Sequence, residues 1–192
     1  FMPALSKIGE FEFVGVGVCS AKERENINNE SEIDYRRYKC DQIEKARFFT
    51  ENYGGQIFQS YEEAVSSDET DAVYIPLPPA LHYKWTKLAL ENGKHVLVEK
   101  PSTLTAKDTE SLIHLAGTKE LALHENYMFV YHSQLDAIDE IIRLGEIGEV
   151  RLYRISFGFP RRAQNDFRYS KKAGGGALFD AGGYTMKYAT RL

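Results

Sequence analysis

The sequence has little cysteine: Cys19 and Cys40 are the only two in 192 residues. Two cysteines without a motif exclude a disulfide framework and a structural zinc site. The five histidines form no close pair with the spacing of metal ligands, so we expect no metal. Cys19 ends an apolar stretch and is expected to be a small buried residue. This use of cysteine fits a reducing compartment, and we expect the protein to be cytoplasmic.

Positive charge is not in excess either, because 24 Lys and Arg stand against 28 Asp and Glu, for a formal net charge of −4. This balance argues against the basic surface that nucleic acid binding requires. The sequence has no apolar run long enough to span a bilayer, so neither a nucleic acid nor a membrane is an expected partner. The composition is that of a globular protein with one full domain and part of another.

A native start is also lacking. The first residues, Phe1-Met2-Pro3, resemble neither a usual start nor a signal peptide. Both ends of the sequence fall within helical patterns. We therefore interpret the chain as a fragment at both ends.

Short apolar strands alternate with amphipathic helices over the first two thirds of the chain, which predicts βαβ units and a doubly wound parallel sheet of Rossmann type. Residues 20–40 are charged and rich in asparagine, which indicates a surface insertion. Strands are expected at 11–19, 56–58, 71–76, 95–99 and 121–124, with helices at 2–8, 41–53, 60–66, 80–92 and 105–117.

The pattern changes after Asn126. We expect a helix at 133–144 and then, at 150–159, a half-exposed strand in which apolar and polar residues alternate. Such a strand is typical of an antiparallel or mixed sheet. A basic loop at 160–173 leads to a final helix. We therefore predict a Rossmann dinucleotide-binding domain at 1–124 and the start of an α/β domain at 125–192.

The stretch Gly93–Pro101 (GKHVLVEKP) is a buried strand that ends in an acid, a lysine and a proline. Ligands of open α/β sheets bind beyond the carboxyl ends of the strands, so Glu99 and Lys100 are candidate site residues. The alternative is a solvated strand end at which Pro101 stops the strand.

The final helix carries Asp180 and Tyr184 four residues apart and therefore on one face. Three glycines, Gly174–Gly176, permit a close approach of the backbone at the electropositive start of this helix. The alternative is structural, with Asp180 as an acid favoured by the helix dipole and Tyr184 at the edge of the core.

Four motifs in this order resemble the Gfo/Idh/MocA oxidoreductase family, and the resemblance covers nearly the whole chain. They are Ile75-Pro76-Leu77-Pro78 with His82, Glu99-Lys100-Pro101, Glu125-Asn126-Tyr127-Met128, and the stretch 174–184 with Asp180 and Tyr184. The resemblance implies a Rossmann domain that binds NAD or NADP, a second domain with substrate contacts, and a homo-oligomeric parent protein. The first strand and the glycine-rich turn of such a domain are missing from this sequence, so we expect the chain by itself to bind the cofactor poorly.

The resemblance assigns the catalytic lysine to Lys100 and the acid of the second domain to Asp180. Many members have histidine at the position of Tyr184. A tyrosine there resembles the subgroup of sugar 3-ketoreductases, dihydrodiol and xylose dehydrogenases and glucose–fructose oxidoreductase, in which the tyrosine donates or accepts the proton. The resemblance implies hydride transfer between the nicotinamide and a carbon of a sugar or polyol. We expect Lys100 to polarise the oxygen and to lower the pKa of Tyr184. Asp180 would orient the substrate or hold Lys100 charged.

Ser20 stands where NAD-preferring Rossmann domains place an acid, and Lys22 and Arg24 follow it. This favours NADP over NAD, unless the two cations only begin the surface insertion. The resemblance adds further cofactor contacts at Pro76, Leu77, Pro78, His82, Glu99, Lys100 and Asn126.

For His82 the alternative is a packing role at the start of a helix. Arg161, Arg162 and Arg168 are interpreted as solvated loop charges. For Arg168, the alternative is a substrate contact beside Lys100, Asp180 and Tyr184.

Two other functions remain open on the same fold. One is an NAD-dependent glycosidase, which would release sugar without net redox change. The other is a non-catalytic nucleotide-sensing regulator, which would do neither.

Overall fold

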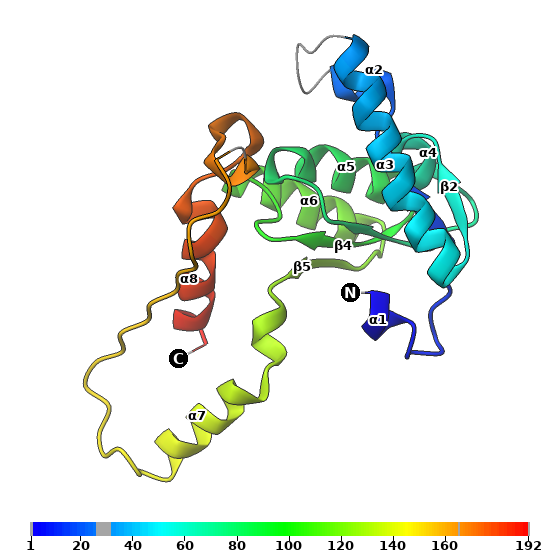
Figure 1. Cartoon of the computed structure of the whole chain (residues 1–192). Helices are drawn as coiled ribbons and strands as arrows, with labels where there is room; N and C mark the ends of the chain where they lie inside the picture. Colours follow the sequence, from blue (N-terminus) through cyan, green and yellow to red (C-terminus); the bar gives the residue numbers. More distant parts are fainter. Residues whose placement is uncertain (1, 26–31, 165, 192) are drawn as a thin grey trace. The chain divides into compact units, whose positions relative to one another are not determined.

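The computed structural model describes residues 2–25, 32–164 and 166–191 (Figure 1). The chain divides into two compact units, Phe1–Val73 with Lys87–His95, and Tyr74–Thr86 with Val96–Leu192. The α/β class and the parallel strands predicted from the sequence are confirmed. Among the helices described, none has the length and apolar character needed to cross a membrane.

The first unit contains a two-stranded parallel sheet of β1 (Gly15–Gly17) and β2 (Gln56–Phe58). Buried Val18 and Phe58 belong to its core, together with Ala46 and Val65 from the helices. Cys19 is 2% exposed, as predicted. The helices of this unit are α1 (Met2–Leu5), α2 (Ala21–Glu25), α3 (Glu32–Tyr53) and α4 (Tyr61–Ser66).

A buried carboxylate connects the starts of α2 and α4. Glu23 is 5% exposed, and its side chain accepts hydrogen bonds from the backbone N–H groups of Ser20 (2.7 Å), Tyr61 (3.2 Å) and Glu62 (2.9 Å). The Ser20 hydroxyl in turn accepts from the Glu23 N–H at 3.3 Å, which is the reciprocal pattern of a capping box. Ser20 is therefore the N-cap residue of α2.

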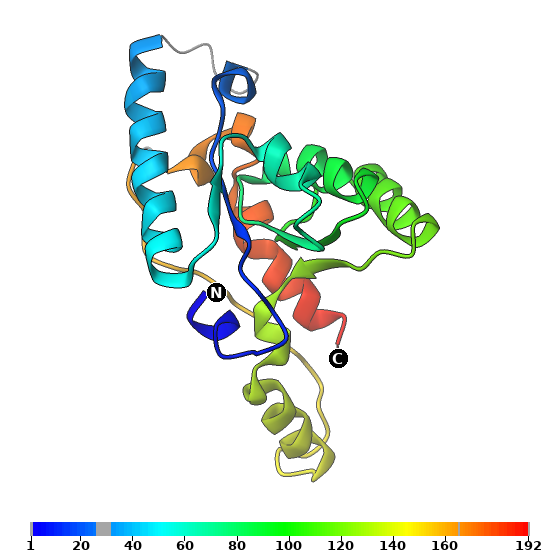
Figure 2. The same ribbon diagram turned by 90° about the vertical axis from the view of Figure 1, so that its right-hand side faces the viewer.

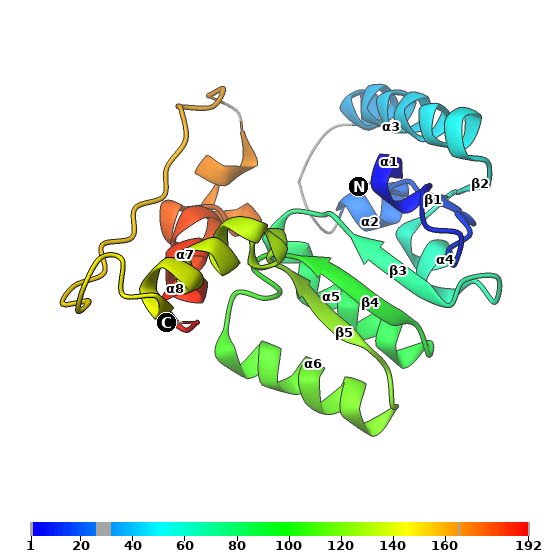
Figure 3. The ribbon, with the colours of Figure 1, turned by 90° about the horizontal axis from the view of Figure 1, so that it is seen from below.

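A second sheet has the order β3 (Ala72–Ile75), β4 (His95–Glu99) and β5 (Leu123–Asn126). β4 and β5 are parallel, with Val96 opposite Leu123 and Glu99 opposite Asn126 (Figure 3). In both sheets, strands that follow each other in the chain are neighbours, as they are within each half of a doubly wound fold. The carboxyl ends of all three strands belong to the second unit.

Local signals explain where the helices begin. The Thr105 hydroxyl accepts from the Asp108 N–H (3.1 Å) at the start of α6 (Ala106–Thr118), and the Ser60 hydroxyl accepts from the Glu63 N–H (2.9 Å) at α4. α5 (Pro79–Glu91) begins with a proline, which is favourable in a first turn.

The last third of the chain has little regular structure besides its helices. Residues 150–159 are extended but form no strand within the part described (Figure 2). The strand predicted there is absent because nothing in the described chain pairs with it, and a strand needs a neighbour for its backbone hydrogen bonds. The elements are the 3₁₀ helices η1 (Met128–Tyr131), η2 (Phe167–Tyr169) and η3 (Lys171–Ala173), α7 (Ser133–Arg143), the π-helix η4 (Leu178–Gly182) and α8 (Gly183–Ala189).

Several predicted bounds need correction. α3 begins at Glu32, so much of the predicted surface insertion is helical, while its residues 26–31 lie outside the described part. β1 is shorter than 11–19, and β5 lies two residues later than predicted. The predicted 56–58 and 95–99 strands are confirmed at both ends.

We expect Glu23→Ala to destabilise the protein by about 2–3 kcal/mol, because it leaves three backbone N–H groups without their charged acceptor. Urea denaturation measures this change. Glu110→Ala, at an exposed position of α6, is the matched control and should change the free energy of unfolding by less than about 0.5 kcal/mol. Equal effects of the two substitutions would contradict the role given to Glu23.

Candidate active site

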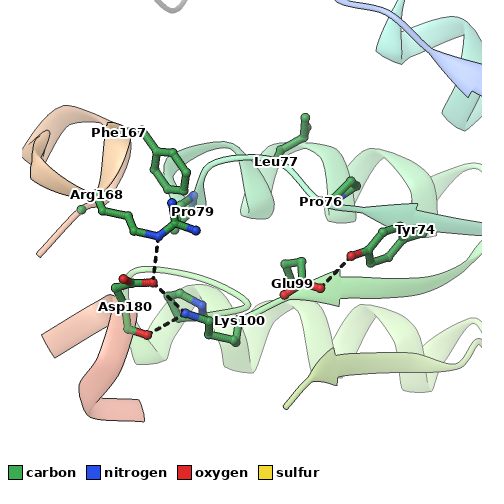
Figure 4. A pocket seen from close by; sticks show the side chains of 12 residues that line it. Tyr74, Pro76, Leu77, Pro79, Glu99, Lys100, Phe167, Arg168 and Asp180 are labelled. Atoms are coloured by element: carbon green, nitrogen blue, oxygen red, sulfur yellow. Dashed lines mark hydrogen bonds and ion pairs between the residues drawn. The ribbon is translucent and has the colours of Figure 1, made fainter. Parts of the chain in front are cut away.

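A cavity of about 270 Å³ lies in the second unit, beyond the carboxyl ends of β3 and β4 (Figure 4). Its walls come from these strand ends, the turn before α5, the loop with η2, and η4. This is where ligands bind in an open α/β sheet. The lining residues are Tyr74, Pro76, Leu77, Pro79, Glu99, Lys100, Pro101, Phe167, Arg168, Gly174, Gly175 and Asp180.

Lys100 and Asp180 form an ion pair across this cavity. The Lys100 Nζ donates to Asp180 Oδ1 at 2.9 Å and to the main-chain oxygen of Asp180 at 2.6 Å. Only 13% of the lysine side chain and 15% of the aspartate side chain are exposed. Charges removed from water to this degree require a partner, and each of these two side chains provides the partner of the other.

Arg168 belongs to the same charge network. Its Nε donates to Asp180 Oδ1 at 3.2 Å and its Nη1 to Asp166 Oδ1 at 3.1 Å (Figure 4 shows the first bond). The backbone N–H and the guanidinium of Arg168 hold the pKa of Asp166 below its usual range. Arg168 is only 28% exposed, so the interpretation of this residue as a solvated loop charge is wrong. Its contact with substrate remains a prediction.

Tyr184 lies among aromatic rings next to Lys100. Its ring stacks on Phe157 with the centroids 4.4 Å apart and meets Tyr127 edge to face at 5.4 Å. Phe129 lies 5.5 Å away, and Lys100 Nζ is 5.0 Å from the centroid of the Tyr184 ring. The structure thus brings together Lys100, Asp180 and Tyr184, from segments far apart in the sequence.

The pKa of Tyr184 is raised, and not lowered as we expected from the nearby ammonium. Burial of the phenol is the main cause, and the negative charges of Glu99 and Asp180 add to it, while Arg168 opposes them. The phenol of Tyr184 therefore keeps its proton at neutral pH.

Glu99 is held by one residue from each neighbouring strand. The Tyr74 hydroxyl and the Asn126 amide both donate to Glu99 Oε1, each at 2.7 Å. Burial and the bond to Glu99 raise the pKa of Tyr74, which keeps this hydroxyl a donor. Asn126 does not line the cavity but fixes a carboxylate that does.

His82 lies behind the cavity wall and is 0% exposed. Its ring nitrogens contact two main-chain oxygens, Nδ1 that of Pro101 at 2.7 Å and Nε2 that of Leu77 at 2.5 Å. Burial lowers the pKa of His82 despite these two contacts. The side chain thus connects the turns after β3 and β4, which supports the packing role given above as the alternative to a cofactor contact.

The glycine stretch lets the chain pack closely against itself. Gly174 has φ +79°, and a Cβ there would lie 2.9 Å from Pro79 Cβ. A Cβ on Gly175 would overlap the carbonyl of Arg168, which also accepts from the Gly176 N–H at 2.9 Å. The close approach predicted for Gly174 and Gly175 is confirmed, but its partner is the protein's own backbone. The final helix begins at Leu178, after these glycines.

The other predicted site residues lie at different depths. Pro76 and Leu77 line the cavity, whereas half-buried Pro78 does not. Ser20 and exposed Lys22 belong to the first unit. Two residues that line the cavity, Tyr74 and Phe167, were not predicted from the sequence. The only signals were that Tyr74 lies near the end of a predicted strand and that Phe167 directly precedes Arg168.

The cavity is smaller than a typical ligand pocket. Its volume of about 270 Å³ is just below the ~300–1,000 Å³ of such pockets, so it is too small for a whole dinucleotide. The prolines of the turn before α5 provide an apolar wall, and Glu99 and Lys100 provide an acceptor and donors. The described residues contain no group of three or more side chains suited to hold a metal ion.

The pKa of His82 predicts how stability depends on pH. Because its pKa is below 6.5 in the folded protein, the unfolded chain takes up a proton first as the pH falls. The stability that neutral His82 contributes is therefore present above about pH 6.5 and lost as the pH falls below it.

We expect His82→Gln to reduce this acid sensitivity in denaturation curves recorded between about pH 5 and pH 8. His114→Gln, at an exposed position of α6, is the control and should leave the sensitivity as it is. A His82→Gln profile parallel to that of the wild type would contradict this assignment.

Gly183 is required by the position of Tyr127. A Cβ on Gly183 would overlap the Tyr127 hydroxyl and lie 3.0 Å from its ring carbon Cζ. Tyr127 is 7% exposed, and burial raises its pKa to about 12, so this ring has little room to move.

We expect Gly183→Ala to lower the free energy of unfolding by about 1–3 kcal/mol through overpacking. Adding Tyr127→Phe removes the overlapping oxygen and should recover most of this loss. Gly117→Ala on α6, where a Cβ meets nothing within 4 Å, is the control and should not destabilise. Thermal denaturation of Gly183→Ala, Tyr127→Phe and the double variant gives the coupling, and its absence would show that Tyr127 and Gly183 do not constrain each other.

Comparison with known proteins gives matches along almost the whole chain. Residues 10–127 match a model described as an oxidoreductase family with an NAD-binding Rossmann fold, and residues 135–192 match the GFO/IDH/MocA C-terminal domain.

Among the relatives, the dTDP-3,4-didehydro-2,6-dideoxy-alpha-D-glucose 3-reductase of Streptomyces violaceoruber is 46% identical over 149 residues, which are 78% of this chain and 44% of that protein. D-xylose 1-dehydrogenase (NADP(+)) 2 of Haloferax volcanii is 34% identical, over 69% of this chain and 41% of that protein.

Among solved structures, a 3-ketoreductase from Actinomadura kijaniata in complex with NADP and TDP-benzene superposes with a TM-score of 0.83 at 34% identity, over 99% of this chain and 52% of that one. The chain thus spans about half the length of these relatives. From these matches we conclude that the chain belongs to the Gfo/Idh/MocA oxidoreductase family.

Proposed function

We propose that the protein reduces a carbonyl group of a sugar with NADPH, with Lys100 and Tyr184 at the reacting oxygen. The observation that carries this proposal is the position of the Lys100 ammonium, 2.9 Å from Asp180 and 5.0 Å from the ring centroid of Tyr184, at the wall of the cavity. Tyr184 does not itself line the cavity, and the proposal places its hydroxyl at the carbonyl oxygen when substrate is bound. An ammonium and a phenol are the two groups that a carbonyl oxygen needs when it becomes a hydroxyl.

Family membership and the relatives support the cofactor and the substrate class. Their names include a dTDP-sugar 3-reductase and an NADP(+)-linked xylose dehydrogenase, and one relative was crystallised with NADP. Glu99, Lys100 and the turn at Pro76–Pro78 would hold the nicotinamide end. When bound, NADPH supplies a hydride for the carbonyl carbon.

Two domains are part of the proposal, a cofactor domain at 1–124 and a substrate domain that begins at 125. The two family models support this division, because one ends at residue 127 and the other begins at residue 135.

Lys100 can stabilise negative charge on the substrate oxygen without releasing Asp180. An ammonium has three N–H donors, and two of them are used by the carboxylate and the main-chain oxygen of Asp180. The third is available for the carbonyl oxygen. Asp180 thereby orients the donor and keeps it charged in a partly buried site.

Tyr184 is proposed to donate the proton that completes the hydroxyl group. Burial, Glu99 and Asp180 raise its pKa, which keeps the phenol protonated over the physiological range. A protonated phenol can donate a proton, which is the role that a reduction requires. The rings of Phe157 and Tyr127 limit the directions in which this phenol can point.

We expect Lys100→Ala and Tyr184→Phe each to lower kcat by about 10²–10⁴-fold in the whole protein, the usual contribution of a positioned acid or electrostatic donor. Arg143→Ala, on the exposed surface of α7, is a control for loss of a cation and should leave kcat unchanged. The measurement is NADPH oxidation with keto-sugars. Unchanged turnover in both site variants would end the proposed mechanism.

The pH dependence tests the role of Tyr184 independently. Because the pKa of its phenol lies above 10 in the folded protein, kcat/KM for reduction should show no loss from this group between about pH 6 and pH 9. A loss in this range that disappears in Tyr184→Phe would contradict the raised pKa. Release of sugar without net NADPH oxidation would indicate a glycosidase, and binding of nucleotide without either reaction a sensor.

A further inference from the structure

Two carboxylates line the cavity, and positive charge balances only one of them. Asp180 is bound by two cations, Lys100 Nζ at 2.9 Å and Arg168 Nε at 3.2 Å. Glu99 has no ion pair with any residue that the structure describes, and its partners are neutral groups. The lining therefore presents one anion that a positively charged part of a ligand can neutralise.

Three neighbouring strands fix the place of this anion. Glu99 ends β4, and Asn126 lies directly opposite it at the end of β5. Tyr74 belongs to β3, on the other side of β4, and Figure 4 shows its hydroxyl directed at Glu99. Both donors bind the same oxygen, Oε1, at 2.7 Å. The other carboxylate oxygen, Oε2, has no hydrogen bond to the described residues and stays available to a ligand.

Tyr74 contributes both a hydrogen bond and a wall. It lines the cavity together with Glu99, and its raised pKa keeps the hydroxyl a donor. A hydroxyl and an amide donate hydrogen bonds without adding charge, so Tyr74 and Asn126 hold the carboxylate and leave its negative charge in place. A carboxylate next to an aromatic ring suits a flat ligand ring that carries positive charge.

The ring at the nicotinamide end of the cofactor changes its charge in the proposed reduction. It is neutral in NADPH. It carries a positive charge in NADP⁺, after the hydride has passed with its electron pair to the carbonyl carbon and the carbonyl oxygen has taken a proton. A fixed anion nearby stabilises the charged ring and has little effect on the neutral one. It also favours departure of the hydride, because positive charge develops on the ring in the transition state.

We propose that Glu99 makes the cavity prefer the oxidised nicotinamide ring, and that Tyr74 and Asn126 are positioning residues that hold Glu99 in place. The inference rests on the proposed function, because it assumes that the nicotinamide end binds in this cavity. Tighter binding of NADP⁺ than of NADPH makes bound NADPH a stronger hydride donor, which agrees with the direction of the proposed reduction.

The test measures the Kd of NADP⁺ by calorimetry and the Kd of NADPH by its fluorescence, on the whole protein. Glu99→Gln removes the charge and keeps the shape of the side chain. The Kd of NADP⁺ should rise about tenfold or more, while that of NADPH should change by less than about twofold. ADP-ribose 2′-phosphate, which lacks the nicotinamide, should bind as it does to the wild type. Glu110→Gln, at an exposed position of α6, is the matched control and should leave all three constants unchanged.

Tyr74→Phe keeps the ring and removes the hydroxyl. The preference for NADP⁺ over NADPH should fall about threefold or more, because a carboxylate with one donor is held less firmly. In a Glu99→Gln background the same substitution should not change the preference further, since no charge remains to be positioned. Asn126→Ala should behave like Tyr74→Phe. Tyr153→Phe, at a position that is 44% exposed, is the control for loss of a hydroxyl.

An unchanged ratio of the two Kd values in Glu99→Gln would overturn the inference, whether both affinities are kept or both are lost equally. A further fall of the preference when Tyr74→Phe is added to Glu99→Gln would overturn the positioning role of Tyr74. Failure of the proposed function has a different signature, because the binding preference would then hold while no keto-sugar supports NADPH oxidation. A whole protein that binds neither form of the cofactor would overturn both proposals.

Discussion

The ion pair between Lys100 and Asp180 is the interaction on which the candidate site depends. It joins the end of β4 to the start of the last helix, two segments 80 residues apart in the sequence. One ammonium donates both to the carboxylate and to the main-chain oxygen of Asp180, which fixes the position of the helix as well as that of the side chain. Because both side chains are largely withdrawn from water, removal of Asp180 leaves Lys100 without its charged partner. Arg168 adds a second cation to the same carboxylate oxygen.

The surroundings of Tyr184 set the direction in which the pKa of its phenol is shifted. The general argument that an ammonium lowers the pKa of a phenol led to the wrong sign here. Burial among Phe157 and Tyr127, together with two nearby carboxylates, raises the pKa, while Lys100 is engaged by Asp180. A charge neutralised by its own partner has little remaining influence on a neighbour. The phenol of Tyr184 therefore keeps its proton at neutral pH.

The parts of the site that local sequence encodes could be predicted. A buried strand followed by Glu99 and Lys100 has one place in an open α/β sheet, and Ser60 and Thr105 begin helices through bonds within three residues. Contacts between distant segments could not be predicted in this way. The bond from Tyr74 to Glu99 and the burial of Arg168 depend on how segments meet, about which neither periodicity nor composition is informative.

The two errors in secondary structure have the same origin. Alternation at 150–159 predicts which side chains share a face, but a strand forms only where another strand supplies hydrogen bonds. Conversely, α3 begins at Glu32, in a stretch whose sequence shows little apolar periodicity. The hydrophobic pattern alone therefore predicts a helix that is too short, beginning at residue 41 and not at Glu32.

The charges at the site also limit what a substrate can place there. The one N–H of Lys100 that Asp180 leaves available suits a neutral carbonyl oxygen, which accepts a hydrogen bond without displacing the carboxylate. A phosphate would have to separate Lys100 or Arg168 from partners that they already bind in a partly buried setting.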